Sequence, residues 1–142
     1  MFDEIKIEWD EKKLGRLERF VKNPPRSFWA SLGQIAKAGV IGNFRAGADL
    51  STGKQWEKKK DGKRSFLTKT KQLRRVVSQS GDGFAEVGTN MVYGRIHQFG
   101  GLAGKTRRAV IPARPWLTLS DFTKRRIAVL VRRENQIAHL SD

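Results

Sequence analysis

The chain has 142 residues, of which 29 are lysine or arginine and 14 are aspartate or glutamate, so its formal charge is +15. Its length supports one hydrophobic core, and the absence of cysteine excludes disulfide scaffolds, thiol nucleophiles and cysteine-ligated metal sites. No apolar run approaches the roughly 20 residues of a membrane span, and the acidic start resembles no secretory signal, so we expect a soluble chain made in the cytoplasm, without a membrane partner.

The first 44 residues predict a strand followed by two helices. Apolar and polar residues alternate over residues 4–9, which is the period of a half-buried strand. Asp10 is a suitable N-cap for a helix that extends to about Lys22. Asn23-Pro24-Pro25 ends this helix, and a second helix is expected at 26–44, because proline is tolerated in a first helical turn.

A basic segment without apolar periodicity follows. Residues 45–70 contain three glycines, and residues 54–75 hold ten bases against two acids. Loops of this length are usually functional or disordered, so we expect residues 45–70 to be a mobile assembly arm that becomes ordered against a partner. The positive electrostatic field of so many basic residues favours DNA or an acidic protein surface as the partner. The candidate contacts here are Trp56, Lys58, Lys59, Lys60, Lys63 and Arg64.

The second half predicts a hairpin, a short helix, an edge strand and a final helix. Gly81-Asp82-Gly83 separates strands at 76–80 and 84–88. A short helix ends at Gly100-Gly101, and a glycine- and lysine-rich loop at 100–108 follows. Its candidate contacts are Lys105, Arg107 and Arg108.

A strand at 109–112 and a helix at 121–140 complete the chain, with Ser120 and Asp121 as its cap. The predicted fold class is α+β: a small antiparallel sheet containing all four strands packs against two or three helices. We expect one domain over residues 1–142, with mobile loops at about 45–70 and 100–108.

Catalytic and cofactor sites find no support. A phosphate-binding loop ending in Gly104-Lys105-Thr106 would need a glycine where Phe99 stands, and a strand rather than a helix follows it. His97 and His139 lie far apart without acids at metal-binding spacing, so His97 is better explained as a packed residue. Asp82 and Glu86 are best explained as solvated surface acids. We expect no catalytic residue, no metal and no cofactor.

Several motifs resemble one family. Glu86-Val87-Gly88-Thr89-Asn90, then Tyr93, then Ile96-His97-Gln98-Phe99-Gly100-Gly101, then Ile111-Pro112-Ala113-Arg114-Pro115-Trp116-Leu117 are similar to the phage virion morphogenesis family, which includes tail-completion proteins of Mu-like phages. Residues 43–47, 53–56 and 73–75 agree in order and approximate spacing. The chain departs from the family at 66–72, where a Thr-Gly turn is usual.

The resemblance implies a structural, non-enzymatic protein of the head–tail junction or tail end, made in the host cytoplasm and incorporated into the virion. It implies a closed ring, a hexamer or dodecamer, with neighbouring neck, tail tube or connector proteins and DNA in the channel as candidate partners. Its role would be tail terminator, stopper or completion factor. The motif residues expected to be structural are Tyr93, Ile96, His97, Phe99, Gly100, Gly101, Ile111, Pro112, Arg114, Pro115 and Trp116.

The alternative is a stand-alone basic nucleic-acid-binding protein. It is less favoured, because such a protein places its bases on a helix or sheet, whereas here the densest bases fall in a segment interrupted by glycine. We also expect Trp116 and Phe99 to be buried, since exposing large aromatic side chains is costly, and Arg114 to be held by a backbone carbonyl or an acid.

Overall fold

The computed structural model describes residues 3–8, 24–58, 75–91 and 94–140. The predicted helix at 10–22 and residues 59–70 lie outside these ranges. The described elements are β1 (Asp3–Glu8), α1 (Arg26–Ala46), β2 (Ala48–Asp49), β3 (Lys54–Gln55), β4 (Val77–Gly81), β5 (Phe84–Thr89), α3 (Gly94–Phe99), β6 (Gly101–Ala103), β7 (Ala109–Ile111) and α4 (Asp121–Leu140).

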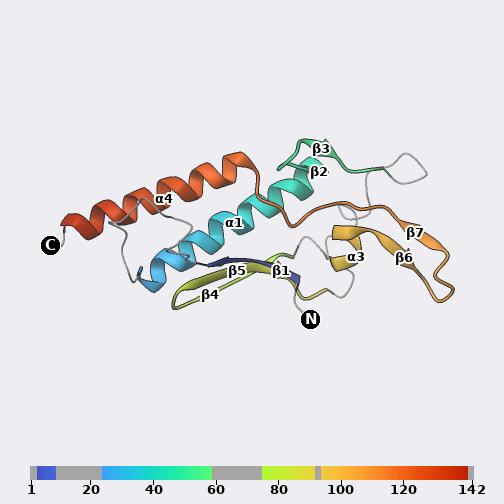
Figure 1. Ribbon diagram of the computed structural model, residues 1–142, viewed down its shortest axis with the longest axis horizontal. Coiled ribbons are helices and arrows are strands. Elements are labelled where there is room, and N and C mark those ends of the chain that lie inside the picture. The colour runs from blue at the N-terminus through green and yellow to red at the C-terminus, as the bar shows by residue number, and fades with distance from the viewer. Residues whose placement is uncertain (1–2, 9–23, 59–74, 92–93, 141–142) are drawn as a thin grey trace.

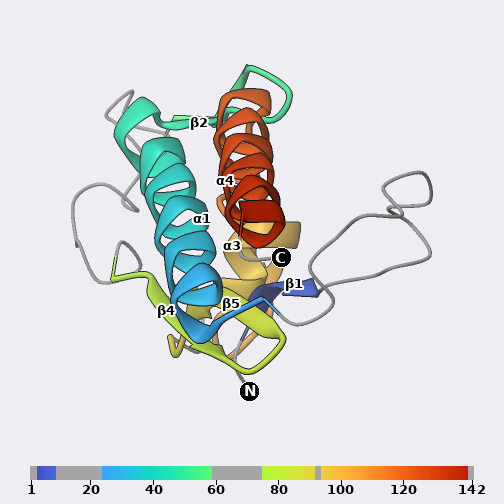
Figure 2. The same ribbon diagram turned by 90° about the vertical axis from the view of Figure 1, so that its left-hand side faces the viewer.

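Strands β1, β5 and β4 form an antiparallel sheet with β5 in the centre. The register pairs Ile5 with Val87 and Ser80 with Ala85. The β4–β5 turn contains Gly83 at φ 80°, a conformation that glycine adopts without a steric cost. Helix α1 lies over one face of this sheet, and α4 runs antiparallel beside α1 (Figures 1 and 2). The predicted α+β class and the strands at 4–9, 76–80 and 84–88 are confirmed.

Helix α1 confirms the prediction at 26–44 and extends to Ala46. Pro25 precedes its first turn, and Gly47 ends it in the left-handed conformation at φ 62°, with its N–H donating to the Asn43 and Phe44 carbonyls. One stripe of the helix is buried. Its members are Phe28, Trp29, Leu32, Gly33, Ala36, Val40, Asn43 and Phe44.

The stripe contributes to two apolar clusters. Near the start of α1, Phe28, Trp29 and Leu32 pack with Ala85 of β5, and α4 covers this cluster with half-buried side chains. Near the end of α1, the buried residues come from segments far apart in sequence. They are Ala36, Val40, Phe44, Trp56, Val76, Val87 and Trp116.

The structure corrects the prediction of an open loop from residue 45 onward. After Gly47, β2 and β3 pair as a short hairpin, with Ala48 opposite Gln55. The Asp49 carboxylate accepts hydrogen bonds from the Ser51 N–H and, across the fold, from the Thr118 hydroxyl at 2.8 Å. Residues 45–58 are therefore folded, because contacts with a distant segment supply the stability that the local sequence lacks.

The prediction also placed the strand at 109–112 incorrectly. β7 does not join the main sheet but pairs antiparallel with β6, so the predicted loop at 100–108 begins with a strand. Helix α4 confirms the prediction at 121–140, and the Ser120 hydroxyl accepts the Thr123 N–H at 3.1 Å as an N-cap should.

The turn acid Asp82 is exposed, as expected, and it has a defined partner. Its carboxylate receives two hydrogen bonds from the Arg26 guanidinium, at 2.7 and 2.9 Å. These hydrogen bonds and the adjacent positive charge lower the pKa of Asp82. The pair connects the first turn of α1 to the β4–β5 turn, although a solvent-exposed ion pair contributes little to stability.

Candidate assembly surfaces

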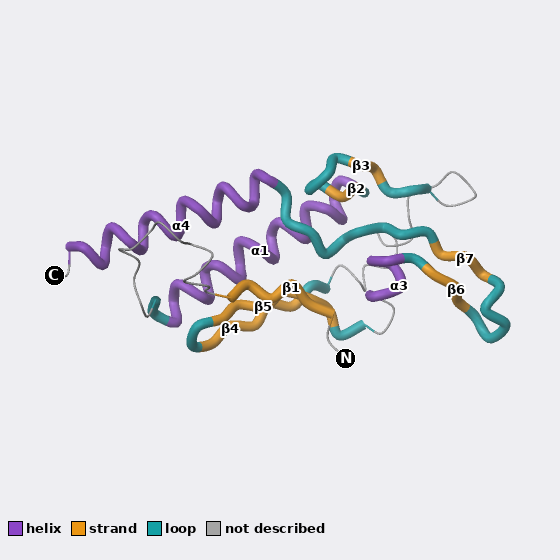
Figure 3. The backbone as a smooth tube through the Cα atoms, in the orientation of Figure 1, coloured by secondary structure: helices purple, strands orange, loops and turns teal. Residues whose placement is uncertain are grey.

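Residues 112–120, here called the bridging segment, connect β7 to α4. They run between the β2–β3 hairpin and α3 (Figure 3). Asn43 of α1 holds this segment: its amide nitrogen donates to the Trp116 carbonyl at 2.8 Å and to the Thr118 carbonyl at 3.1 Å, and its amide oxygen accepts the Leu50 N–H. One buried side chain therefore connects α1, the hairpin and the bridging segment.

Trp116 is the centre of the bridging segment and is fully buried, as predicted. Its indole N–H donates to the Gly94 carbonyl at 2.9 Å. The side-chain oxygen of Gln98 accepts the backbone N–H groups of Trp116 and Leu117 at 3.0 and 2.9 Å. The ring centre of Phe44 lies 5.7 Å from that of Trp116, so apolar packing and directed hydrogen bonds both fix this residue.

Trp56 is buried in the same cluster. Its ring packs edge-on against Phe44 at 5.5 Å, and its indole N–H donates to the Pro115 carbonyl at 3.0 Å. The prediction that Trp56 contacts a partner is therefore wrong for the folded subunit, because its apolar surface is already used inside the chain.

Arg114 is held as predicted, by a backbone carbonyl. Its Nε donates to the Glu57 carbonyl at 3.0 Å, and its backbone N–H donates to the His97 carbonyl at 2.7 Å. His97 is buried, as expected of a packed residue. Burial, with a smaller contribution from the charge of Arg114, lowers the pKa of His97 to about 4. The imidazole is thus neutral at physiological pH.

Gly100, the first of the two glycines after α3, stands where a close backbone contact leaves no room for a side chain. It has φ 74°, and a Cβ at this position would lie 2.9 Å from both the Ala113 nitrogen and the Ile111 oxygen. Any side chain would collide with the backbone of the bridging segment. The glycine therefore permits the close approach on which the direction of β6 depends.

Strands β6 and β7, with the turn between them, form a two-stranded ribbon that projects from the body at the end opposite the C-terminus (Figure 1). Leu102 and Val110 on this ribbon are 58% and 74% exposed. Phe99, at its base, is 71% exposed, so its predicted burial is wrong: the chain reverses at Gly100 and leaves the ring outside the core. The turn carries the exposed bases Lys105, Arg107 and Arg108.

The remaining residues that were expected to be structural differ in how far they are buried. Ile96, Ile111, Pro112 and Pro115 are half-buried, and Gly101 is exposed at φ 151°. Lys58 is exposed, while Tyr93, Lys59, Lys60, Lys63 and Arg64 lie outside the described residues.

Asn43 and Gln98 lie in the family motifs but were not predicted as structural residues, and Asp49 was not singled out at all, although all three connect distant segments. A signal existed for Asn43, because it is a polar residue on the apolar stripe of α1.

Among the described residues, no group of three or more histidine, cysteine, aspartate or glutamate side chains could hold a metal ion. Within the same part of the chain, no helix is both long and apolar enough to cross a membrane.

Residues 10–135 match the model of the phage virion morphogenesis family. Since this match covers most of the chain, the protein belongs to that family, and a role in assembling the phage virion follows. A curated relative is the Mu-like prophage FluMu G protein 2 of Haemophilus influenzae, 37% identical over 91 residues. The aligned part is 63% of this chain and 63% of that relative, which is less than two thirds of either. No solved structure matches the chain.

Proposed function

We propose that the protein is a non-enzymatic structural subunit that forms a closed ring, a hexamer or dodecamer, and completes the tail or joins it to the head. The observation that carries this proposal is the β6–β7 ribbon, which is anchored at its base but exposes apolar side chains along its length. Membership in a virion morphogenesis family and the likeness to a Mu-like prophage protein support the phage context.

The ribbon has the properties of an interface element. A two-stranded hairpin alone is marginally stable in water, and its outer edges present backbone groups that can pair with another strand. Leu102 and Val110 would lose contact with water in such a complex, at about 25 cal/mol for each Å² of apolar surface buried. We infer that this ribbon docks on a neighbouring subunit.

The position of the ribbon at one end of the molecule supports a head-to-tail ring (Figure 1). A contact between the ribbon of one copy and a different surface of the next is head-to-tail, and such contacts give rings when the rotation between copies closes. The neighbouring neck, tail tube or connector proteins would then meet the faces of the ring, at the head–tail junction or tail end.

The test is the native mass of the purified protein, alone and mixed with purified tails. We expect the unmodified chain to give a closed oligomer in at least one condition, and the Leu102→Ser/Val110→Ser variant to remain monomeric while it melts like the parent. Leu50→Ser, at an exposed site in the β2–β3 turn, is the matched control and should assemble. A normal ring from the ribbon variant, or a monomer from the unmodified chain in both conditions, would refute the proposal.

The second candidate function, nucleic-acid binding, is favoured by the three exposed bases at the ribbon's turn and by the overall charge. If DNA is the partner, affinity should fall linearly with the logarithm of salt concentration. Reversing Lys105, Arg107 and Arg108 to glutamate should then reduce that slope. Reversing Lys58, Lys59 and Lys60 should also reduce it and should impair head–tail joining without unfolding the domain. Normal infectivity of particles carrying the triple variant would show that these lysines are a solvated surface.

A further inference from the structure

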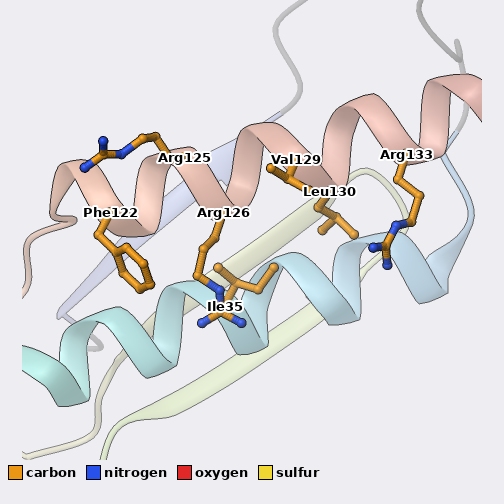
Figure 4. Close-up of a pocket in the computed structure, with 7 residues that line it drawn as sticks. All are labelled: Ile35, Phe122, Arg125, Arg126, Val129, Leu130 and Arg133. Atoms are coloured by element: carbon orange, nitrogen blue, oxygen red, sulfur yellow. The ribbon is translucent and has the colours of Figure 1, made fainter.

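A groove of about 610 Å³ lies between α1 and α4, and no residue of the ribbon lines it. Its lining combines apolar side chains with three arginines (Figure 4). Phe122 and Val129 of α4 are 66% and 51% exposed, while Ile35 of α1 and Leu130 of α4 are half-buried. The groove therefore has an apolar centre that the described part of the chain leaves open to water.

Arg125, Arg126 and Arg133 surround this centre, and all three are exposed. None of them forms an ion pair with another described residue; among the described residues the ion pair is Arg26–Asp82, and neither of these residues lines the groove. Helix α1 contains no acidic residue. The two acids on the described side-chain portion of α4, Asp121 and Glu134, do not line the groove. The positive charge around the apolar centre is thus uncompensated within the described structure.

We propose that this groove binds an acidic amphipathic helix of a partner protein, whose apolar side chains cover Phe122 and Val129 and whose carboxylates pair with Arg126 and Arg133. The spacing suits a helix: the 12 residues from Phe122 to Arg133 span about 16 Å along α4, the length of about three helical turns. A helix in an apolar groove is a common mode of recognition, and guanidinium groups bind carboxylates through paired hydrogen bonds.

Charge and shape separate this occupant from DNA. A duplex backbone would satisfy the arginines but would leave the exposed ring of Phe122 and the side chain of Val129 without apolar partners, since phosphates and sugars are polar. An acidic helix satisfies both features at once. This partner site is separate from the ribbon and does not depend on the proposed ring.

The first experiment measures binding to a defined probe. It uses a synthetic amphipathic peptide with leucines at helical spacing flanked by glutamates, and the same peptide with lysines in place of the glutamates. We expect fluorescence anisotropy to show binding of the glutamate peptide alone. Arg126→Glu/Arg133→Glu should weaken it at least about tenfold, a loss of about 1.4 kcal/mol.

The matched control is Lys124→Glu/Arg132→Glu, which changes the net charge equally at exposed positions of α4 that do not line the groove. It should retain most of the affinity. Equal weakening by both double variants would show attraction by the general charge and would overturn the proposal, as would absence of binding. Duplex DNA that competes with the peptide and depends selectively on Arg126 and Arg133 would identify a phosphate site instead and would also overturn it.

A second measurement tests whether the groove is open in the protein itself. Because the chain contains no cysteine, Phe122→Cys introduces a single thiol in the groove. We expect maleimide to label it at the rate of an exposed thiol, and the glutamate peptide to slow the labelling. Strong protection in the monomer without peptide would mean that other residues of the same chain already cover the groove, and the partner site would be rejected.

Discussion

Replacing Asn43 with alanine tests the idea that one side chain holds three distant segments together. Asn43 is fully buried, its two amide hydrogens are shared among acceptors on Trp116 and Thr118, and its oxygen accepts the Leu50 N–H. Hydrogen bonds of this kind contribute about 1 kcal/mol each, and groups left buried without partners add to the loss. We therefore expect Asn43→Ala to lower the free energy of unfolding by about 3 kcal/mol.

Urea unfolding followed by tryptophan fluorescence measures this change, and for a chain of this size the melting temperature should fall by roughly 10 °C. Gln34→Ala is the matched control on the same helix, because Gln34 is exposed and makes one side-chain hydrogen bond, to Ser78 at 3.1 Å. We expect it to cost less than about 0.5 kcal/mol. If Asn43→Ala costs no more than the Gln34 control, the network does not stabilise the fold and the reasoning fails.

Three further predictions concern the base of the ribbon. Trp116→Ala should cost roughly 3–5 kcal/mol in urea unfolding, the usual loss for a deleted core aromatic, and a variant as stable as the parent would contradict its burial. Gly100→Ala should be destabilised by at least about 2 kcal/mol because of the backbone collision, whereas Gly104→Ala, which has a positive φ but open space, should cost about 1 kcal/mol. Equal losses of stability in the two variants would show that the backbone around Gly100 shifts and relieves the collision. The pKa of His97 in the folded state, about 4, lies below its ordinary value of 6.5, so its contribution to stability is complete above pH 6.5 and is lost as pH falls toward 4. Comparison with His97→Gln should reveal up to about 3 kcal/mol of pH-dependent destabilisation over this range, and parallel pH profiles would contradict it.

Elements with a strong local pattern were predictable from the sequence. Alternation gave the strand at 4–9, helical spacing gave the helices at 26–44 and 121–140, and the glycines at 81 and 83 marked the turn of a hairpin. These signals are local because each element must present one apolar face to the core, whatever its neighbours are. The burial of Trp116 and the carbonyl partner of Arg114 were also predicted correctly.

The predictions that were wrong concern features that depend on contacts between distant residues. The β2–β3 hairpin was taken for an open loop because its stability comes from Thr118 and Pro115, more than 50 positions away. Phe99 was expected in the core because exposing a large aromatic side chain is costly, but the turn at Gly100 directs the chain outward. The groove between α1 and α4 could not be foreseen, since it depends on how two helices 75 positions apart pack together.

In the proposed ring, the rigid base of the ribbon would set the angle between neighbouring subunits. In a head-to-tail ring, the rotation between neighbours must be the same at every contact, and small angular errors add up around the ring until it fails to close. Gly100 and Arg114 attach both ends of the ribbon to the body, and Trp116 is in turn attached to α3 and α1. Because close-packed cores deform little, these contacts fix the direction of the ribbon relative to the sheet and helices. A variant that loosens this base while the domain stays folded should therefore give open or heterogeneous oligomers, whereas removal of Leu102 and Val110 should give monomers.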